Sequence, residues 1–294
     1  SDGTNFLVVW RERSVVAPAS KIHARQISGS GTLGTVQTPF STTSSIYDYP
    51  TVTFGGAGYA IAWKEAVNGY TIRFLRLTAA GAAIFVPLAV ANDASSSAFQ
   101  YAHLEAQTGS AYLLTWNGQG TSGYDIFGRA ISKTGSLVGN PLTISSAPQS
   151  QYRSRSSFNG TDFLVTWYDY RSGSSNCEIY GQRVTTTGAL VGTSAAGNVA
   201  VSLGVNSQRY PDPVWCGGRY SVFFQDYRYN NNPTLFRQKI SGSGKLIDAD
   251  AHANEIVYAN SNRVDYPIRA VCAGQKIFVV WREGNTLHGT LVAP

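Results

Sequence analysis

The chain has 294 residues, 43% of them hydrophobic, so it can bury a sizeable core and wholesale disorder is excluded. Only 14% are charged, where roughly a quarter is usual, and the abundance of Gly (30) and Tyr (17) favours short strands and turns over helical bundles. The net charge of +6 is spread along the chain, which argues against a nucleic-acid binder, and no apolar run reaches the roughly 18 residues of a membrane span.

An apolar run that ends in an aromatic residue recurs six times and predicts one strand of a repeated unit. The copies are residues 6–10, 59–63, 112–116, 163–167, 220–224 and 277–281. Their terminal aromatics are 51 to 57 residues apart, and five of the six tryptophans occupy this position. We name this strand b. Its residues are apolar on both faces, as in strands that are covered on both sides.

Three further strands complete the predicted unit. Strand c follows each copy of strand b after a polar loop, at residues 22–27, 72–77, 126–131, 179–184, 235–240 and 287–292. A glycine turn then leads to strand d, for example residues 141–144, and a longer connection leads to strand a of the next unit. The unit is a four-stranded antiparallel sheet with two faces to cover, which predicts a β-propeller.

The number of blades follows from the strand count. Strands b and c occur six times but strands a and d only five, because the chain opens at a strand b and stops after a strand c. We expect six blades, with terminal blades that are three-stranded or completed by residues upstream of this chain; the alternative is five blades and an extra hairpin. No Pro/Ser-rich spacer interrupts the period, so we expect residues 1–294 to form a single domain.

The fourth repeat carries a resemblance to a known class of sequences. Its phrase Gly-Thr-Asp-Phe-Leu-Val-Thr-Trp-Tyr-Asp-Tyr-Arg (160–171), followed by Ile-Tyr-Gly-Gln-Arg-Val (179–184), is similar to a repeat of large secreted bacterial proteins. The resemblance implies a propeller and an extracellular setting, and it brings no catalytic residues. The lack of Met, even at position 1, predicts a processed or excised product. We therefore expect a secreted or cell-surface protein, or part of a longer polypeptide or assembly.

The b–c and d–a connections are long and rich in charge, so we expect a ligand site on their face, near strands a. Each strand a begins near a tyrosine, whose flat face and hydroxyl suit a sugar ring. The predicted ligand-binding set is Tyr49, Tyr101, Tyr152, Tyr210, Tyr266, His103, Arg153 and Arg209. The alternative is that these tyrosines only pack between blades.

Catalysis by paired carboxylates needs two acids roughly 5 to 10 Å apart. The acids near the presumed axis are Asp48, Glu105, Asp212 and Asp265, and nothing in the sequence selects a pair. The four histidines have no metal-ligand spacing. Calcium at Asp248, Asp250 and Glu255 competes with the simpler interpretation of a solvated loop, so no cofactor is expected.

Two repeated features predict structural contacts. Asp169-x-Arg171 and Asp226-x-Arg228 follow strand b in successive repeats, so we expect each Asp to accept turn amides and each Arg to bridge to the next blade. Cys216 and Cys272 stand at equivalent positions, and a disulfide requires their Cα atoms to lie within about 7 Å. Cys177 is expected to be free.

The regular repeat shows no residue set that breaks its symmetry, which favours a non-enzymatic, exported binding module for a glycan or protein partner. One alternative is a propeller glycoside hydrolase or polysaccharide lyase. Another is a structural subunit of a surface layer or filament.

Overall fold

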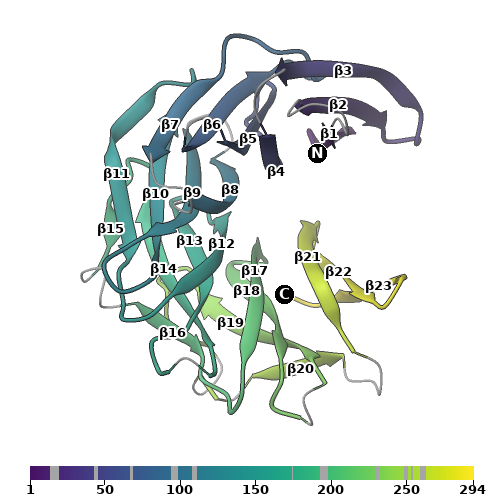
Figure 1. Ribbon diagram of the computed structural model, residues 1–294. Coiled ribbons are helices and arrows are strands. Elements are labelled where there is room, and N and C mark those ends of the chain that lie inside the picture. Colours follow the sequence, from purple (N-terminus) through teal and green to yellow (C-terminus); the bar gives the residue numbers. More distant parts are fainter. Residues whose placement is uncertain are drawn as a thin grey trace. The chain divides into compact units, whose positions relative to one another are not determined.

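The chain folds entirely into β-strands. The computed structural model describes residues 1–13, 20–42, 46–66, 69–93, 99–107, 111–173, 175–192, 198–229, 232–247, 251–252, 254–258 and 263–294. These residues contain 23 strands and no helix, so none that could cross a membrane (Figure 1). The strands form six antiparallel sheets, the blades of a β-propeller. The prediction of six blades is therefore confirmed over the five-blade alternative.

The blades follow one another along the chain, and within each the strands pair in the predicted order. Blades 1 to 3 comprise β1 (Asn5–Arg13), β2 (Ser20–Ser28) and β3 (Leu33–Thr42); β4 (Ile46–Phe54), β5 (Tyr59–Ala66), β6 (Tyr70–Leu77) and β7 (Leu88–Asp93); and β8 (Phe99–Gln107), β9 (Ala111–Gln119), β10 (Tyr124–Ser132) and β11 (Leu137–Ser145). Blades 4 to 6 comprise β12 (Gln151–Phe158), β13 (Asp162–Asp169), β14 (Glu178–Thr185), β15 (Leu190–Val191) and β16 (Val199–Ser202); β17 (Gln208–Cys216), β18 (Arg219–Asp226), β19 (Thr234–Ser241) and β20 (Glu255–Tyr258); and β21 (Asp265–Ala273), β22 (Lys276–Glu283) and β23 (Thr286–Val292).

The first and last blades have three strands each within the described residues. Blade 1 consists of strands b, c and d, and blade 6 of strands a, b and c. This confirms the expected incomplete terminal blades. In blade 4 the outermost strand is divided, since β15 and β16 both pair with β14 at different points along it.

Two compact units divide the chain. The first comprises Ser1–Gln119, Phe127–Leu142 and Thr186–Gly188, and the second Gly120–Ile126, Thr143–Thr185 and Ala189–Pro294. The expectation of a single domain stays a prediction, and each unit is described by itself.

The cores consist of strands b and the strands that cover them. Every residue of β13 is buried, and Trp63, Trp116 and Trp167 are less than 2% exposed. In the second unit, Leu164 and Tyr220 of adjacent blades belong to one core cluster. Burial on both faces explains why strand b has no polar alternation.

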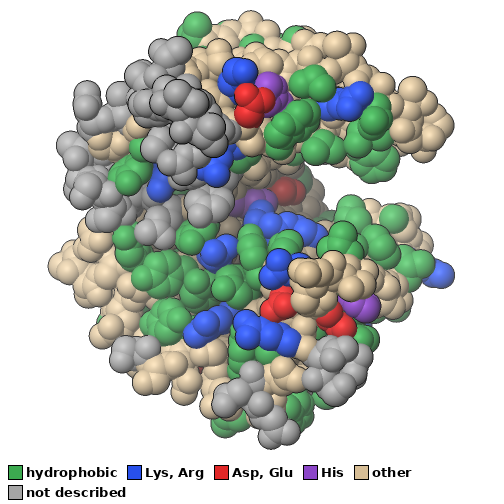
Figure 2. All heavy atoms as spheres, turned by 45° about the vertical axis from the view of Figure 1, so that its right-hand side comes forward, with side chains coloured by type: hydrophobic (Ala, Val, Ile, Leu, Met, Phe, Trp, Pro, Cys, Tyr) green, Lys and Arg blue, Asp and Glu red, His purple; other side chains and the backbone are tan. Residues whose placement is uncertain are grey.

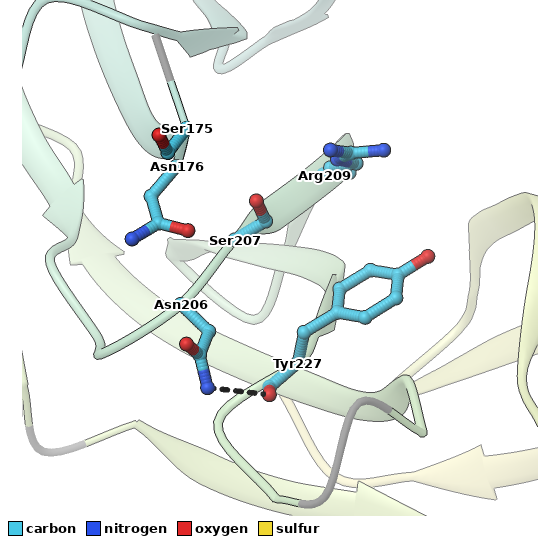
Figure 3. A pocket seen from close by; sticks show the side chains of 6 residues that line it. All are labelled: Ser175, Asn176, Asn206, Ser207, Arg209 and Tyr227. Carbon is cyan, nitrogen blue, oxygen red and sulfur yellow. Dashed lines mark hydrogen bonds between the residues drawn. The ribbon is translucent and has the colours of Figure 1, made fainter. Parts of the chain in front are cut away.

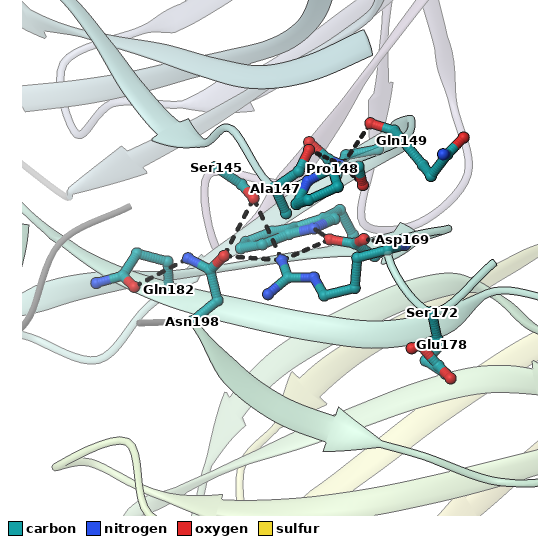
Figure 4. Close-up of polar contacts among 12 residues, drawn as sticks. Ser145, Ala147, Pro148, Gln149, Asp169, Ser172, Glu178, Gln182 and Asn198 are labelled. Atoms are coloured by element: carbon teal, nitrogen blue, oxygen red, sulfur yellow. Dashed lines mark hydrogen bonds and ion pairs between the residues drawn. The ribbon is translucent and has the colours of Figure 1, made fainter. Parts of the chain in front are cut away.

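A polar clamp joins neighbouring blades in the second unit (Figure 4). The Asp169 carboxylate accepts hydrogen bonds from the Arg171 backbone N–H at 2.9 Å and its guanidinium at 2.6 Å. The same guanidinium donates to Asn198 at 2.8 Å, and Asn198 accepts from Ser145 of the preceding blade at 3.1 Å.

The clamp recurs one blade further on, with Asp226, Arg228, Asn254 and Ser202 in the corresponding roles. The prediction that each Asp accepts a turn amide is thus confirmed. The predicted direction of the Arg bridge is wrong, because each arginine reaches the preceding blade and not the next one.

Candidate functional site

Each strand a contains a β-bulge opposite the aromatic residue that ends the apolar run of strand b. In blade 4 the ladder passes from Tyr152↔Tyr168 to Arg155↔Thr166, and in blade 5 from Arg209↔Gln225 to Asp212↔Phe223. The same shift occurs in blades 2 and 3, and in blade 6 three residues of β21, 266–268, stand opposite Trp281. A bulge inserts a residue that the ladder does not use and turns its side chain to a new direction.

The first bulge residue has a left-handed backbone in three blades. The φ angle is 53° at Tyr101, 56° at Arg153 and 57° at Tyr210. Bulky residues seldom adopt positive φ, and such strain gathers at functional sites. The predicted tyrosine column is therefore wrong by one residue in blade 4, where Arg153 and not Tyr152 occupies the bulge. Tyr152 corresponds instead to Arg209 of blade 5.

The first ladder residue after the bulge is also polar in the second unit. It is Arg155 on β12, Asp212 on β17 and Arg269 on β21, three first strands that pack side by side. Asp212 is 7% exposed, and it accepts a hydrogen bond from the Ala270 N–H at 2.7 Å. Its other oxygen lies 3.8 Å from a guanidinium nitrogen of Arg269. A carboxylate thus stands between two arginines of the flanking blades.

Tyrosine rings form a continuous chain across these blades. Ring centroids are 5.6 Å apart for Tyr152 and Tyr168, 5.6 Å for Tyr168 and Tyr210, and 4.6 Å for Tyr210 and Tyr266. The Arg153 guanidinium lies 5.1 Å from the Tyr210 centroid and 4.7 Å from that of Tyr266, within cation–π range. Arg153, Arg155, Tyr210, Asp212, Tyr266 and Arg269 are called the arginine–tyrosine cluster below.

Charge and burial shift the acidities within this cluster. Burial raises the pKa of Asp212 although Arg269 and Arg155 act against it. Burial also disfavours ionisation of Tyr266, but Arg155 and Arg269 outweigh it and lower the pKa of the phenol. Arg269 donates to the Tyr266 hydroxyl at 3.4 Å. The site therefore combines a carboxyl whose pKa is raised with a phenol whose pKa is lowered.

A polar pocket of about 220 Å³ lies on the face of the b–c and d–a connections, and Arg209 in its lining is the sequence neighbour of Tyr210 in the cluster. Its lining is Ser175, Asn176, Asn206, Ser207, Arg209 and Tyr227. Figure 3 shows the Arg209 and Tyr227 side chains extending to the same side, with Asn206 donating to the Tyr227 carbonyl at 3.2 Å. In Figure 2 the Lys and Arg side chains lie among side chains coloured as hydrophobic, a colour class that includes tyrosine.

The remaining predicted residues fall into three groups. Tyr101, His103 and Glu105 lie on β8 in the first unit. The side chains of Asp48 and Tyr49 lie outside those that the structure describes, as do Asp248 and Asp250. Asp265 precedes the bulge of β21, where its oxygens accept from Arg263 at 2.6 Å and from the Gly284 N–H at 3.1 Å.

The described residues offer neither a metal site nor an exposed thiol. Among the described residues, no three His, Cys, Asp or Glu side chains gather as a metal site requires. Cys216 and Cys272 form a disulfide between β17 and β21 with Cα atoms 5.5 Å apart, and Cys177 is free and buried.

The sequence predicts four residues of the cluster, Arg153, Tyr210, Asp212 and Tyr266, but not how they are arranged. Arg155 and Arg269 are not among the residues that the sequence predicts for the site. The signal that places the three ladder residues together is their register, since each pairs with the residue immediately before the terminal aromatic of strand b.

No protein-family model and no curated protein matches the chain. Among solved structures, the β-propeller domain of the Trilobed protease from Pyrococcus furiosus, described as having an open velcro topology, is similar with a TM-score of 0.55 and 9% identity over 99% of this chain and 80% of that one. The Penicillium chrysogenum α-L-arabinanase complexed with arabinobiose has a TM-score of 0.55 and 12% identity over 83% and 77%. The Lactobacillus brevis α-L-arabinofuranosidase has a TM-score of 0.49 and 12% identity over 83% and 89%.

These comparisons correct the leading functional expectation. The arabinanase of similar fold is an enzyme, so this comparison contradicts the interpretation as a non-enzymatic binding module and favours the enzyme alternative. At these identities the likeness itself extends to the fold alone, which is that of a β-propeller.

Proposed function

We propose that this chain is a propeller glycoside hydrolase that cleaves a polysaccharide, with Asp212 as the proton donor. The observation that carries the proposal is the buried Asp212 carboxyl, held on a bulged first strand between Arg155 and Arg269. The arabinanase structure of similar fold supports the reaction class.

Asp212 has the property that a general acid needs. Glycoside hydrolysis requires a carboxylic acid that protonates the leaving oxygen, and such acids work best when their pKa lies near the working pH. Burial raises the pKa of Asp212, which keeps the proton on the carboxyl to higher pH. The neighbouring faces of Tyr210 and Tyr266 offer surfaces for sugar rings.

Asp265 is the second acid that this proposal uses, as base or nucleophile. It lies on β21, the strand next to that of Asp212, and its oxygens accept hydrogen bonds from Arg263 and Gly284. Glycoside hydrolysis uses a second carboxylate beside the proton donor, either as a base that activates water or as a nucleophile.

The proposal is tested by measuring new reducing ends on a panel of arabinan, galactan, xylan and polygalacturonate. We expect release on at least one polymer, and a loss of kcat of about 100-fold or more in Asp212→Asn and in Asp265→Asn. Glu178→Gln on β14 is the matched control and retains activity, since Glu178 contacts Ser172 outside the cluster. Absence of turnover by folded wild-type protein, or full activity of Asp212→Asn, would refute the proposal.

We also infer that the protein works outside the cytosol. The Cys216–Cys272 disulfide supports this setting, because such bonds persist in oxidising compartments. A glycan polymer as substrate agrees with an extracellular location.

A further inference from the structure

We propose that the polar pocket between the b–c loops of blades 4 and 5 binds one neutral sugar residue of the polysaccharide through its hydroxyl groups. This inference rests on the proposed function for the polymer, and it adds a binding subsite that lies apart from Asp212. Arg209 and Tyr227 line the pocket together with serine and asparagine side chains (Figure 3). Arg209 and Asp212 are both on β17, roughly 10 Å apart along the strand, so a polymer that reaches the acid can also reach the pocket.

The backbone around the pocket has a counterpart one blade earlier in the chain. The Tyr227 N–H donates to the Ser207 carbonyl at 3.0 Å, and the Tyr170 N–H donates to the Ser150 carbonyl at the same distance. The residue before each serine has a left-handed backbone, with a φ of 63° before Ser207 and 65° before Ser150. The two joints between blades therefore share one scaffold, and their side chains can be compared position by position.

The side chains of the two joints differ where the pocket lies. At the joint of blades 3 and 4 the Tyr152 ring centroid is 5.3 Å from that of Tyr124 and 6.1 Å from that of Tyr170. At the joint of blades 4 and 5 the third tyrosine is retained, but Arg209 replaces Tyr152 and Cys177 replaces Tyr124. Protein interiors are close-packed, so packing alone would favour keeping the rings. A departure from the repeat that accompanies a polar cavity is better explained by a ligand.

The lining consists largely of groups that both donate and accept hydrogen bonds. Serine hydroxyls and asparagine amides do both, as the hydroxyls of a sugar do, whereas a simple anion needs donors alone. Among the described residues, the side chains of Ser175 and Asn176 have no hydrogen-bond partner, so both are available to a ligand. Asn206 donates its amide N–H to the Tyr227 carbonyl at 3.2 Å, and its amide oxygen can accept from a ligand hydroxyl.

Arg209 and Tyr227 add a cation and a ring to this lining, which contains no carboxylate. The guanidinium carbon lies 5.6 Å from the ring centroid, within cation–π range. A guanidinium has five N–H donors and can serve several hydroxyls, while the ring offers an apolar face. At about 220 Å³ the pocket is smaller than the roughly 300 Å³ at which sites for drug-sized ligands begin, so it suits a single sugar ring.

The test titrates arabinotriose, xylotriose and galactotriose into the wild-type protein by isothermal titration calorimetry. We expect at least one of them to bind with a Kd of about 1 mM or lower. Because neutral hydroxyls carry the contact, the affinity should change less than about 2-fold as salt is raised. Mass spectrometry of the titrated samples shows whether a ligand is cleaved, and a cleaved ligand is titrated again into Asp212→Asn.

Variants locate the binding in the pocket. Arg209→Tyr copies the residue of blade 4, fills the pocket and should weaken binding about 10-fold or more. Ser175→Ala removes one hydroxyl from an exposed loop and should weaken binding about 3-fold. The matched control, Ser122→Ala, removes the hydroxyl at the corresponding position of blade 3 and should change nothing. On the polymer, Arg209→Tyr should act mainly on KM and raise it about 10-fold, as loss of a binding contact away from the reacting bond does.

Absence of binding by all three sugars, or an unchanged affinity in folded Arg209→Tyr, would overturn the inference, and so would an affinity that falls about 10-fold or more with salt. If Arg209→Tyr does not fold, Ser175→Ala decides in the same way. Pocket-dependent binding without cleavage of any polymer would support the inference and refute the hydrolase proposal. Cleavage that requires Asp212 but is indifferent to Arg209→Tyr would do the reverse.

Discussion

Asp169 and Asp125 are both buried carboxylates of the second unit, yet they have different partners. Asp169 accepts from the indole N–H of Trp167 and from Arg171. Asp125 lies against the backbone of Gly120, where an added Cβ would come within 2.1 Å of its oxygen. Burial and the nearby charge of Asp169 raise the pKa of Asp125 to about 6. Its ionisation therefore opposes folding, whereas the charge of Asp169 is used in the clamp.

This difference predicts a pH dependence of stability. Because folding raises the pKa of Asp125 from 3.8 to about 6, the free energy of unfolding falls as the pH rises between these values, and then levels off. A shift of this size corresponds to an upper limit of about 3 kcal/mol, which solvent screening reduces to roughly 1 kcal/mol. We expect Asp125→Asn to be stabilised by that amount at pH 7 and not at pH 4.

Urea denaturation of wild type, Asp125→Asn and Glu178→Gln at both pH values measures the effect. Glu178→Gln controls for the loss of one negative charge. A variant that is no more stable than wild type at pH 7 would show that Asp125 ionises without cost.

At the scale of elements, the clamps hold successive blades through their b–c loops. Arg171 connects Asp169 of its own blade with Asn198, and Asn198 reaches Ser145 of the blade before. The Arg171 side chain also stacks on Tyr180, with 3.7 Å between guanidinium and ring centroid. Loss of the arginine would leave a carboxylate with 0% exposure beside an indole N–H.

We therefore expect Arg171→Ala to lower the free energy of unfolding by about 3 kcal/mol, as removal of one partner of a buried ion pair does. Arg228→Ala should have a similar effect, because the clamp of blade 5 has the same members. Lys245→Ala, on an exposed turn, should stay within about 0.5 kcal/mol of wild type. Denaturant melts of the three variants decide the matter, and equal stability of all three would exclude the clamp as a source of cohesion.

The elements themselves were predictable to a degree that the site was not. Strand b is recognisable in the sequence because burial on both faces makes most of its residues apolar, as at Phe163, Leu164, Val165 and Trp167. The bulges leave no such pattern, since an extra residue changes the pairing but not the composition. Tyr152 matched the tyrosine column by type, while the ladder assigned that position to Arg153. The Arg155–Asp212–Arg269 row depends on strand pairing and could not be read from spacing alone.

At the scale of the whole molecule, the disulfide links blade 5 to the three-stranded blade 6. Cys216 ends β17 and Cys272 lies near the end of β21, 56 residues further along the chain. A cross-link over a loop of this length lowers the entropy of the unfolded chain, which raises the free energy of unfolding by about 4 kcal/mol. The disulfide thus stabilises a blade that lacks an outer strand among the described residues.

We expect reduction, or the double variant Cys216→Ser and Cys272→Ser, to lower the free energy of unfolding by about 4 kcal/mol. Guanidinium melts with and without reductant measure the change. The double variant should not respond to reductant, which controls for effects on Cys177. A wild-type melt that is insensitive to reductant would contradict the prediction.

The bulges have a consequence for how such a protein could be altered. Because their first residue stands outside the hydrogen-bond ladder, strand pairing does not constrain the choice of side chain there. Positions 101, 153 and 210 are thus natural places to diversify in a combinatorial library. Selection from such a library would change what the protein recognises while the scaffold is retained.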